Sequence, residues 1–268
     1  MTTVPQRWTR RLCLGGLSGL LMGATACSHV ATAADTLAQI RQRGYLKIGT
    51  SGTAPPNSWV NSHNELTGYD IDWGNMIGRE LGLLVRWVKT DFRGLMPALA
   101  AGQLDLVITG VRIREQLKQV FLFSEPYSYE LMAAVVRKDD EGMRRFDDLA
   151  GRRVAVVAAS FQEDAIKKMG GYRELLSMPS GSDVFLCLHT RHADVAVVGL
   201  TAAVHYVHAG HDDVRIVKYD GGLNAQGIVM PKTAVDLKAA IDRIVAARRA
   251  DGTYAALYRK NFGLEPLR

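Results

Sequence analysis

The sequence predicts an α/β protein with two lobes. From Leu37 onward, short apolar runs alternate with stretches in which apolar residues recur at helical spacing, as expected for parallel strands joined by crossover helices. The alternation starts again after an apolar, β-prone run at residues 130–137, and the pair Gly221-Gly222 precedes a final strand and helix pattern. Two crossings between the units predict a hinge.

In the first unit, the apolar run at 46–50 predicts the first strand. The next segment, 70–81, places Ile71, Met76, Ile77 and Leu81 at helical spacing. The elements that follow are a strand at 85–88, a helix at 92–101, a strand at 104–108 and a short helix at 115–120. No internal repeat competes with this assignment.

The second unit repeats strand and helix signals over a shorter length. They lie at 153–157, 162–169, 184–188, 195–198, 202–208 and 214–219, and a run at 226–230 with an amphipathic helix at 237–249 closes the pattern. We therefore predict a leader at 1–34, the first part of lobe 1 at 35–129, lobe 2 at 130–223 and a return to lobe 1 at 224–268.

Composition and charge exclude several classes of protein. The chain has 268 residues, 47% of them hydrophobic and 22% charged, which is enough for one large core or two lobes. The net charge of +6 includes Arg7, Arg10 and Arg11, and residues 35–268 carry 30 basic and 27 acidic side chains. Because no basic run with interleaved aromatic residues occurs, no nucleic-acid partner is expected.

The N-terminus is typical of an export signal. Arg7, Arg10 and Arg11 precede an apolar run at 12–26 that is too short and too rich in glycine to span a bilayer. The arginine pair also resembles a twin-arginine signal, so the Sec and Tat routes both stay open. Either route predicts a periplasmic protein.

Two processing outcomes compete at the end of this leader. Small residues favour cleavage near Ala33 or Ala34, whereas a degenerate lipobox before Cys27 predicts acylation and a membrane tether. Only Cys187 survives both outcomes, and its apolar surroundings predict a buried thiol. No disulfide within one chain is expected.

Three segments match one known pattern in their order and spacing. They are 68–82 (GYDIDWGNMIGRELG), 102–127 (GQLDLVITGVRIREQLKQVFLFSEPY) and 250–263 (ADGTYAALYRKNFG). Over 35–264 the chain thereby resembles the family 3 periplasmic solute-binding proteins, which deliver polar amino acids to ABC importers. The resemblance implies a two-lobed, type II periplasmic-binding-protein fold in which a hinge closes the lobes around a ligand in the interlobe cleft.

The residues that normally grip the ligand in this family are missing from their positions. Leu117 replaces the arginine that clamps the α-carboxylate, and Gly199 replaces the aspartate that pairs with the α-ammonium group. Ala54 replaces one stacking aromatic residue, whereas Phe92 keeps the other aromatic wall. Because a zwitterion desolvated without matching charges is costly, we expect a small polar or anionic solute, either amino-acid-like or an organic acid.

Arg112 is the predicted substitute for the lost clamp. It stands where the family uses a serine or threonine hydroxyl on the carboxylate, and its guanidinium can form a bidentate pair. The backbone and hydroxyl groups of Thr109 and Gly110 are expected to hold an anionic oxygen. A solvated loop cation and a turn glycine are the purely structural interpretations.

Four further residues complete the predicted ligand-binding set. Ser160 aligns with the family threonine that contacts the carboxylate, and with Glu163 it also indicates a capping box, two roles that can coexist. Phe161 lies beside it in the sequence. Ser51 and Trp59 belong to the first loop, where Trp59 is expected to close the rim of the pocket or to pack the loop.

No enzyme site, cofactor or metal centre is predicted. The spacing of His205, His208 and His211 suits zinc or copper, but no thiolate or well-placed carboxylate completes the ligand set. Periplasmic cyclohexadienyl dehydratases share the fold, and Glu163 and Asp164 are acids such an enzyme needs. Those enzymes, however, keep the arginine clamp that this sequence has lost.

The expected partners are a small-molecule ligand and either the membrane subunits of an ABC transporter or a periplasmic dehydrogenase. The second partner belongs to an alternative function, a non-transport receptor or an accessory protein of a quinoprotein dehydrogenase system. The protein is expected to be a monomer. A screen of ligands by thermal shift separates a receptor from a metal carrier or an enzyme.

Overall fold

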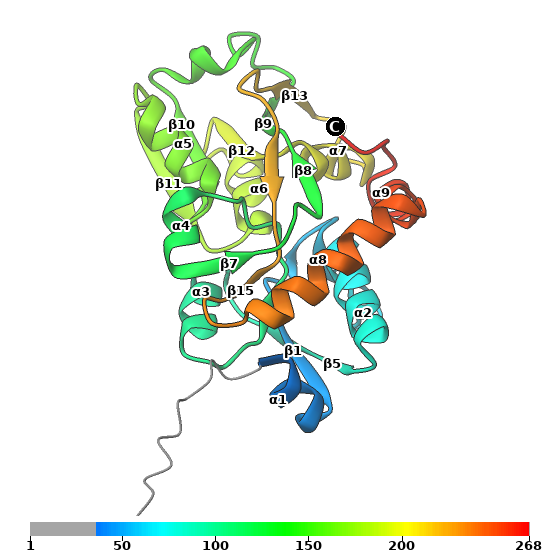
Figure 1. Cartoon of the computed structure of the whole chain (residues 1–268). Helices are drawn as coiled ribbons and strands as arrows, with labels where there is room; N and C mark the ends of the chain where they lie inside the picture. Colours follow the sequence, from blue (N-terminus) through cyan, green and yellow to red (C-terminus); the bar gives the residue numbers. More distant parts are fainter. Residues whose placement is uncertain (1–35, 268) are drawn as a thin grey trace, which may run out of the picture. The chain divides into compact units, whose positions relative to one another are not determined.

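The computed structural model describes residues 36–267, so the predicted export signal, cleavage site and lipidation site lie outside the described residues. Two five-stranded sheets, each flanked by helices, form two lobes (Figure 1). Strands β8 (Ser128–Glu130) and β14 (Asn224–Gln226) pair antiparallel as a separate two-stranded sheet where the chain crosses between the lobes. Among residues 36–267, no helix has the length and apolar character needed to cross a membrane.

The first lobe contains the sheet ordered β5-β1-β6-β15-β7. Its strands are β1 (Tyr45–Thr50), β5 (Leu84–Lys89), β6 (Leu106–Val107), β7 (Phe121–Phe123) and β15 (Val229–Pro231). Its helices are α1 (Thr36–Arg43), α2 (Tyr69–Leu81), α3 (Phe92–Ala100), α4 (Glu115–Val120), α8 (Val235–Ala250) and α9 (Thr253–Phe262). A small sheet of β2 (Thr53–Ala54), β3 (Ser58–Val60) and β4 (Leu66–Thr67) follows β1.

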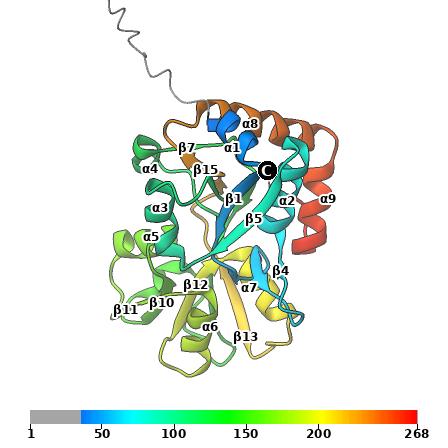
Figure 2. The ribbon, with the colours of Figure 1, turned by 90° about the horizontal axis from the view of Figure 1, so that it is seen from below.

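Close packing of α2 on β5 depends on two glycines. A Cβ atom on Gly74 would lie 2.4 Å from the ring of Trp87, and one on Gly78 would lie 2.3 Å from Val85. The helix and the strand, which lie side by side in Figure 2, can therefore approach more closely than larger residues would permit. Gly82 ends α2 with φ 67°, the left-handed conformation that glycine adopts without steric cost.

The second lobe contains the sheet ordered β11-β10-β12-β9-β13. Its strands are β9 (Met132–Arg137), β10 (Arg153–Val157), β11 (Glu174–Met178), β12 (Val195–Gly199) and β13 (Val214–Lys218), and its helices are η1 (Phe146–Leu149), α5 (Phe161–Met169), α6 (Gly181–His189) and α7 (Leu200–His208). Alternate residues of β9 pack into two different cores, Ala133 and Val135 into one and Ala134 and Val136 into the other. This two-sided burial explains why the run is apolar throughout.

The two-lobed α/β fold predicted from the sequence is confirmed, and the strands and helices it named are present with small shifts at their ends. The sheets are mixed, not purely parallel, because β15, β7, β9 and β13 make antiparallel pairs. The sequence missed β11, an edge strand without an alternating pattern. The apolar run at 184–188 lies in helix α6, where Cys187 is half-buried with its Sγ 3.6 Å from Met178 Sδ.

Candidate functional site

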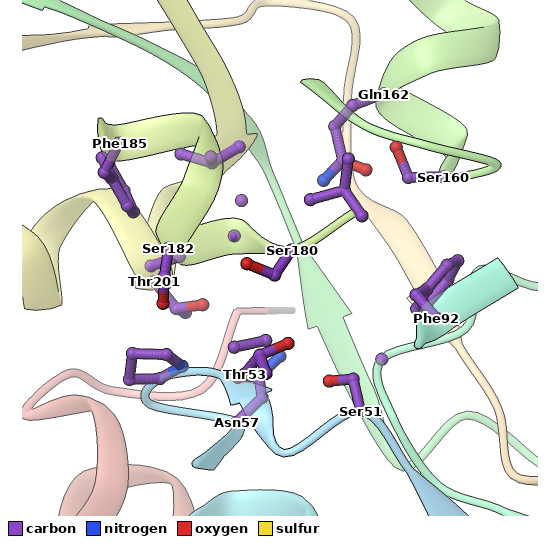
Figure 3. Close-up of a pocket in the computed structure, with 18 of the residues that line it drawn as sticks. Ser51, Thr53, Asn57, Phe92, Ser160, Gln162, Ser180, Ser182, Phe185 and Thr201 are labelled. Atoms are coloured by element: carbon purple, nitrogen blue, oxygen red, sulfur yellow. The ribbon is translucent and has the colours of Figure 1, made fainter. Parts of the chain in front are cut away.

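A cavity of about 510 Å³ lies between the two lobes and is lined from both of them. The wall of the first lobe comes from the segments that follow β1 and β6. The wall of the second lobe comes from the N-terminal end of α5 and from residues along α6 and α7 (Figure 3). Strand ends and helix N-termini supply outward-pointing backbone amides, and the volume falls in the range of small-molecule sites.

The structure brings most of the predicted ligand-binding residues together at this cavity. Its lining includes Ser51, Phe92, Thr109, Gly110, Arg112, Ser160 and Phe161. Trp59 is the exception: it does not line the cavity, and its ring packs 5.7 Å from that of His205 on α7. Trp59 of β3 thus contacts the second lobe, and its expected role of closing the rim of the pocket or packing the loop stays a prediction.

The hydroxyl groups at the first-lobe wall are held by one another. Ser51 N donates to Thr109 Oγ1 at 3.3 Å, and Thr109 Oγ1 donates to Ser51 Oγ at 3.3 Å. Ser58 Oγ accepts from Thr50 Oγ1 at 2.9 Å and from the amide of Gly52 at 3.2 Å. Ser51 and Thr109 are thereby fixed before any ligand arrives, which lowers the entropic cost of binding.

The amide of Gly110 is already engaged. It donates to Tyr127 Oη at 2.9 Å, and Tyr127 Oη donates to Asp70 Oδ1 at 2.7 Å. The Gly110 amide therefore already has an acceptor within the protein, and the expectation that backbone and hydroxyl groups of Thr109 and Gly110 hold an anionic oxygen stays a prediction. Gly110 has φ 65°, which explains the glycine as a turn residue. Asp70 is buried, and burial raises the pKa of its carboxyl to about 7.

Two arginines reach the cavity, and they differ in their partners. Arg114 forms an ion pair with Asp164 of α5. Arg112 has no carboxylate partner among residues 36–267, and its guanidinium carbon lies 5.3 Å from the centre of the Phe161 ring. Leu117, at the family's clamp position, packs instead against the apolar cluster around Leu95 and Phe121.

Serines cap two of the helices that point at the cavity. Ser160 Oγ accepts from the amide of Glu163 at 3.2 Å, and Ser180 Oγ accepts from the amide of Asp183 at 3.2 Å. The Glu163 carboxylate accepts from the amide of Ala159 at 2.6 Å, one residue earlier than in a standard capping box. The capping role predicted for Ser160 is confirmed, and its ligand role stays a prediction.

Glu130 is a cavity residue that the sequence did not indicate. Its side chain is buried, and the residue is only 4% exposed. Its Oε1 accepts from the amides of Leu131 at 3.1 Å and Thr201 at 3.3 Å, and its Oε2 accepts from Thr201 Oγ1 at 2.5 Å. Burial raises the pKa of this carboxyl to about 7.

Asn57 is the second residue that the sequence missed. It belongs to the turn that connects β2 to β3, and it lines the cavity (Figure 3). Its buried Oδ1 has no hydrogen-bond partner among the described residues. A buried acceptor without a partner destabilises a protein unless a ligand or solvent donor reaches it. Its position therefore suits a donor group on a ligand.

The histidines do not converge. His205 lies beside Trp59. His211 stacks on Tyr206 with 3.8 Å between the ring centres, and Tyr206 stacks on Phe185 with 3.9 Å between the ring centres. Within residues 36–267, no three histidine, cysteine or acidic side chains are arranged to hold a metal ion. The three stacked rings, from α6, from α7 and from the segment after α7, form part of the cavity lining.

The chain is similar to several known proteins. Residues 46–264 match the family described as bacterial extracellular solute-binding proteins, family 3. The L-cystine-binding protein TcyJ of Escherichia coli (strain K12) is 27% identical over 230 residues, which cover 85% of this chain and 86% of TcyJ. The lysine/arginine/ornithine-binding periplasmic protein of the same strain is 26% identical, covering 91% of this chain and 94% of the relative. The crystal structure of the P235GK mutant of ArgBP from T. maritima is 31% identical, with a TM-score of 0.81 over 85% of this chain and all of that chain.

Proposed function

Because the chain belongs to the family 3 bacterial extracellular solute-binding proteins, we propose that it captures an α-amino acid between its lobes and presents it to the membrane subunits of an ABC importer. The protein is a binding protein and not an enzyme. The observation that carries the proposal is the cavity, whose walls come from both lobes. A ligand that contacts both walls favours closure by the difference in its affinity for the closed and open states.

Contacts across the cleft support a closed conformation. Arg114 of the first lobe pairs with Asp164 of the second, and the ring of Trp59 packs on that of His205. A Cβ on Gly181, at the start of α6, would lie 3.5 Å from the carbonyl oxygen of Thr53. These contacts lie beside the cavity, so a ligand within it is enclosed by both lobes.

Arg112 is our candidate for the group that binds the ligand's carboxylate. It lines the cavity without a carboxylate partner among the described residues, whereas Arg114 is committed to Asp164. On the wall opposite Arg112, α5 and α6 begin after Ser160 and Ser180. The helix dipoles at these N-terminal ends favour an anion in the cavity. A carboxylate at this end of the cavity would thus be contacted from both lobes.

The known relatives narrow the ligand class expected for this chain. They bind L-cystine in one case and lysine, arginine and ornithine in another. We infer that the amino acid carried by this chain has a long side chain, which would extend toward the stacked rings of Phe185, Tyr206 and His211. Export to the periplasm is part of the same proposal.

Calorimetry on purified protein tests the proposal. L-Arginine, L-lysine, L-histidine and L-cystine are titrated first, and Arg112→Ala is then compared with the wild type. Loss of a charge-assisted hydrogen bond is expected to weaken binding at least tenfold, roughly 1.4 kcal/mol or more. Arg93→Ala is the control, because Arg93 is exposed on α3 and does not line the cavity. An unchanged dissociation constant in Arg112→Ala would eliminate the role of Arg112, and no binding of any of these amino acids would contradict the function.

A further inference from the structure

The cavity wall contains a buried carboxylate, that of Glu130, which forms no ion pair with any residue that the structure describes. Glu130 is 4% exposed and lines the cavity, and no lysine, arginine or histidine forms an ion pair with it among residues 36–267. A buried carboxylate without a counter-charge is destabilising, because its desolvation is not offset by a Coulombic partner. A cation on a ligand in the cavity would therefore offset the desolvation of such a group.

The two oxygens of Glu130 have different surroundings. Oε1 accepts two backbone amides, one from Leu131 and one from Thr201 at the start of α7, which satisfies it as a helix-capping group. Among the residues that the structure describes, Oε2 accepts a hydrogen bond only from the hydroxyl of Thr201. An ionised carboxylate oxygen can accept more than one hydrogen bond. Oε2 therefore keeps acceptor capacity that helix capping does not use.

Oε2 lies next to Gly199. A Cβ atom built on Gly199 would lie 2.7 Å from Oε2 and 2.8 Å from the Cδ atom of Glu130. Gly199 and Thr201 both line the cavity. The carboxylate of Glu130 thus occupies the space into which a side chain at 199 would project, although it comes from a different strand.

We propose that Glu130 binds the ammonium group of the ligand, in place of a side chain on residue 199. The proposal rests on the proposed function, which it deepens by adding a cationic requirement to the ligand. With Arg112 as the carboxylate partner, the ligand is a zwitterion and not a simple organic acid. This narrows the expected solute, either amino-acid-like or an organic acid, to the amino-acid-like alternative.

The position of Glu130 also links the ligand to the crossing between the lobes. Glu130 ends β8 and pairs with Asn224 of β14, the two strands that connect the lobes. Its carboxylate is held by Thr201 of the second lobe. An ammonium group bound here would therefore contact the hinge itself as well as α7.

Pairs of ligands with and without the α-ammonium group test this inference by calorimetry. The pairs are L-arginine with 5-guanidinopentanoate, L-lysine with 6-aminohexanoate, L-histidine with imidazole-4-propionate, and L-cystine with 3,3'-dithiodipropionate. The wild type is expected to bind its amino acid roughly tenfold to a hundredfold more tightly than the deaminated partner, the scale of a charged hydrogen bond. Glu130→Gln is expected to lose most of that preference.

A matched control and a rescue guard against a folding defect. Glu163→Gln makes the same change at a buried carboxylate outside the cavity lining and is expected to keep the wild-type preference. Glu130→Ala removes the crowding at residue 199. The double variant Glu130→Ala/Gly199→Asp is therefore expected to bind the amino acid at least tenfold more tightly than Glu130→Ala.

The outcomes separate the two proposals. If an amino acid binds but Glu130→Gln keeps the full preference for it, the inference is overturned and the proposed function stands. The same holds if the wild type binds both members of a pair equally. If no member of any pair binds, the proposed function fails and this inference fails with it.

Discussion

Arg114, the residue before α4, and Asp164 of α5 form an ion pair that joins the two lobes beside the cavity. The side chains are 25% and 57% exposed, so the pair is partly screened by water. Exposed pairs of this kind contribute roughly 0.2–1 kcal/mol. The pair therefore assists closure but does not control it.

We predict that Asp164→Asn weakens ligand binding by about two- to fivefold, because the closed state loses one cross-lobe interaction. The loss is expected to shrink as salt rises toward 1 M, where surface charges are screened. Calorimetry at two salt concentrations measures both effects. A salt-independent loss of more than tenfold would mean that Asp164 contacts the ligand.

Glu130 makes the stability of the unliganded protein depend on pH. Burial raises its pKa from 4.5 to about 7, so between these values the folded state keeps a proton that the unfolded chain has lost. This contribution to stability is full below about pH 4.5, falls as pH rises toward 7, and stays low above it.

Glu130→Gln removes this titration, and the unliganded variant is expected to unfold at a higher temperature than the wild type at pH 8. The gain in the free energy of unfolding is limited to about 3 kcal/mol and is expected to vanish near pH 4.5. Thermal unfolding at both pH values measures it. In Glu163→Gln the sign is opposite at pH 8, because hydrogen bonds from Ser177, Lys167 and Ala159 outweigh desolvation and lower the pKa of Glu163. If the difference in stability between the wild type and Glu130→Gln is the same at both pH values, Glu130 is not a buried group that titrates between them.

Ligand binding near pH 7 is expected to release a fraction of a proton in the wild type. A bound ammonium group stabilises the ionised carboxylate and so lowers the raised pKa of Glu130. The groups that face this carboxylate are the hydroxyl and amide of Thr201, the amides of Leu131 and Leu200, and the phenol of Tyr258, whose own pKa burial raises.

Titration of L-arginine, or of whichever amino acid binds, in buffers of different ionisation enthalpy measures the released protons. Glu130→Gln is expected to lose most of this proton release. Glu163→Gln is expected to release as many protons as the wild type. Equal release in all three proteins would place the titrating group elsewhere.

The packing of α2 on β5 gives a prediction about stability alone. Gly78→Ala is expected to destabilise the protein by about 1–3 kcal/mol, because the new methyl group would meet Val85 at 2.3 Å and the carbonyl of Leu83 at 3.1 Å. Gly94→Ala, also inside a helix, meets only the Thr90 side chain at 3.2 Å and is expected to be neutral or stabilising. Urea unfolding of both variants tests the contrast, and equal effects would contradict it.

Much of the fold could be predicted because it depends on local patterns. The helical spacing of Ile71, Met76 and Ile77 predicted α2, and the apolar run at 130–137 predicted the crossing into the second lobe. The edge strand β11 escaped because its exposed residues show no alternation. The small sheet of β2, β3 and β4 escaped because its strands are too short for a period to appear.

The candidate site could be predicted only where a position in the chain already implies a place in the cavity. Ser51, Thr109, Arg112 and Ser160 follow strand ends, and all of them line it. The sequence did not indicate that Trp59 packs on His205 or that the Gly110 amide donates to Tyr127, since both contacts depend on segments far away in the sequence.

By itself, the sequence determined the family resemblance, the two lobes and the loss of charged residues at positions 117 and 199, because each of these depends on residue types at fixed spacing. Only the tertiary structure decided which side chains stand near those positions. Glu130 lies 71 residues before Thr201, and no local period relates the two. Their contact exists because the crossing strand β8 packs against the start of α7, which brings a carboxylate into the space that Gly199 leaves empty.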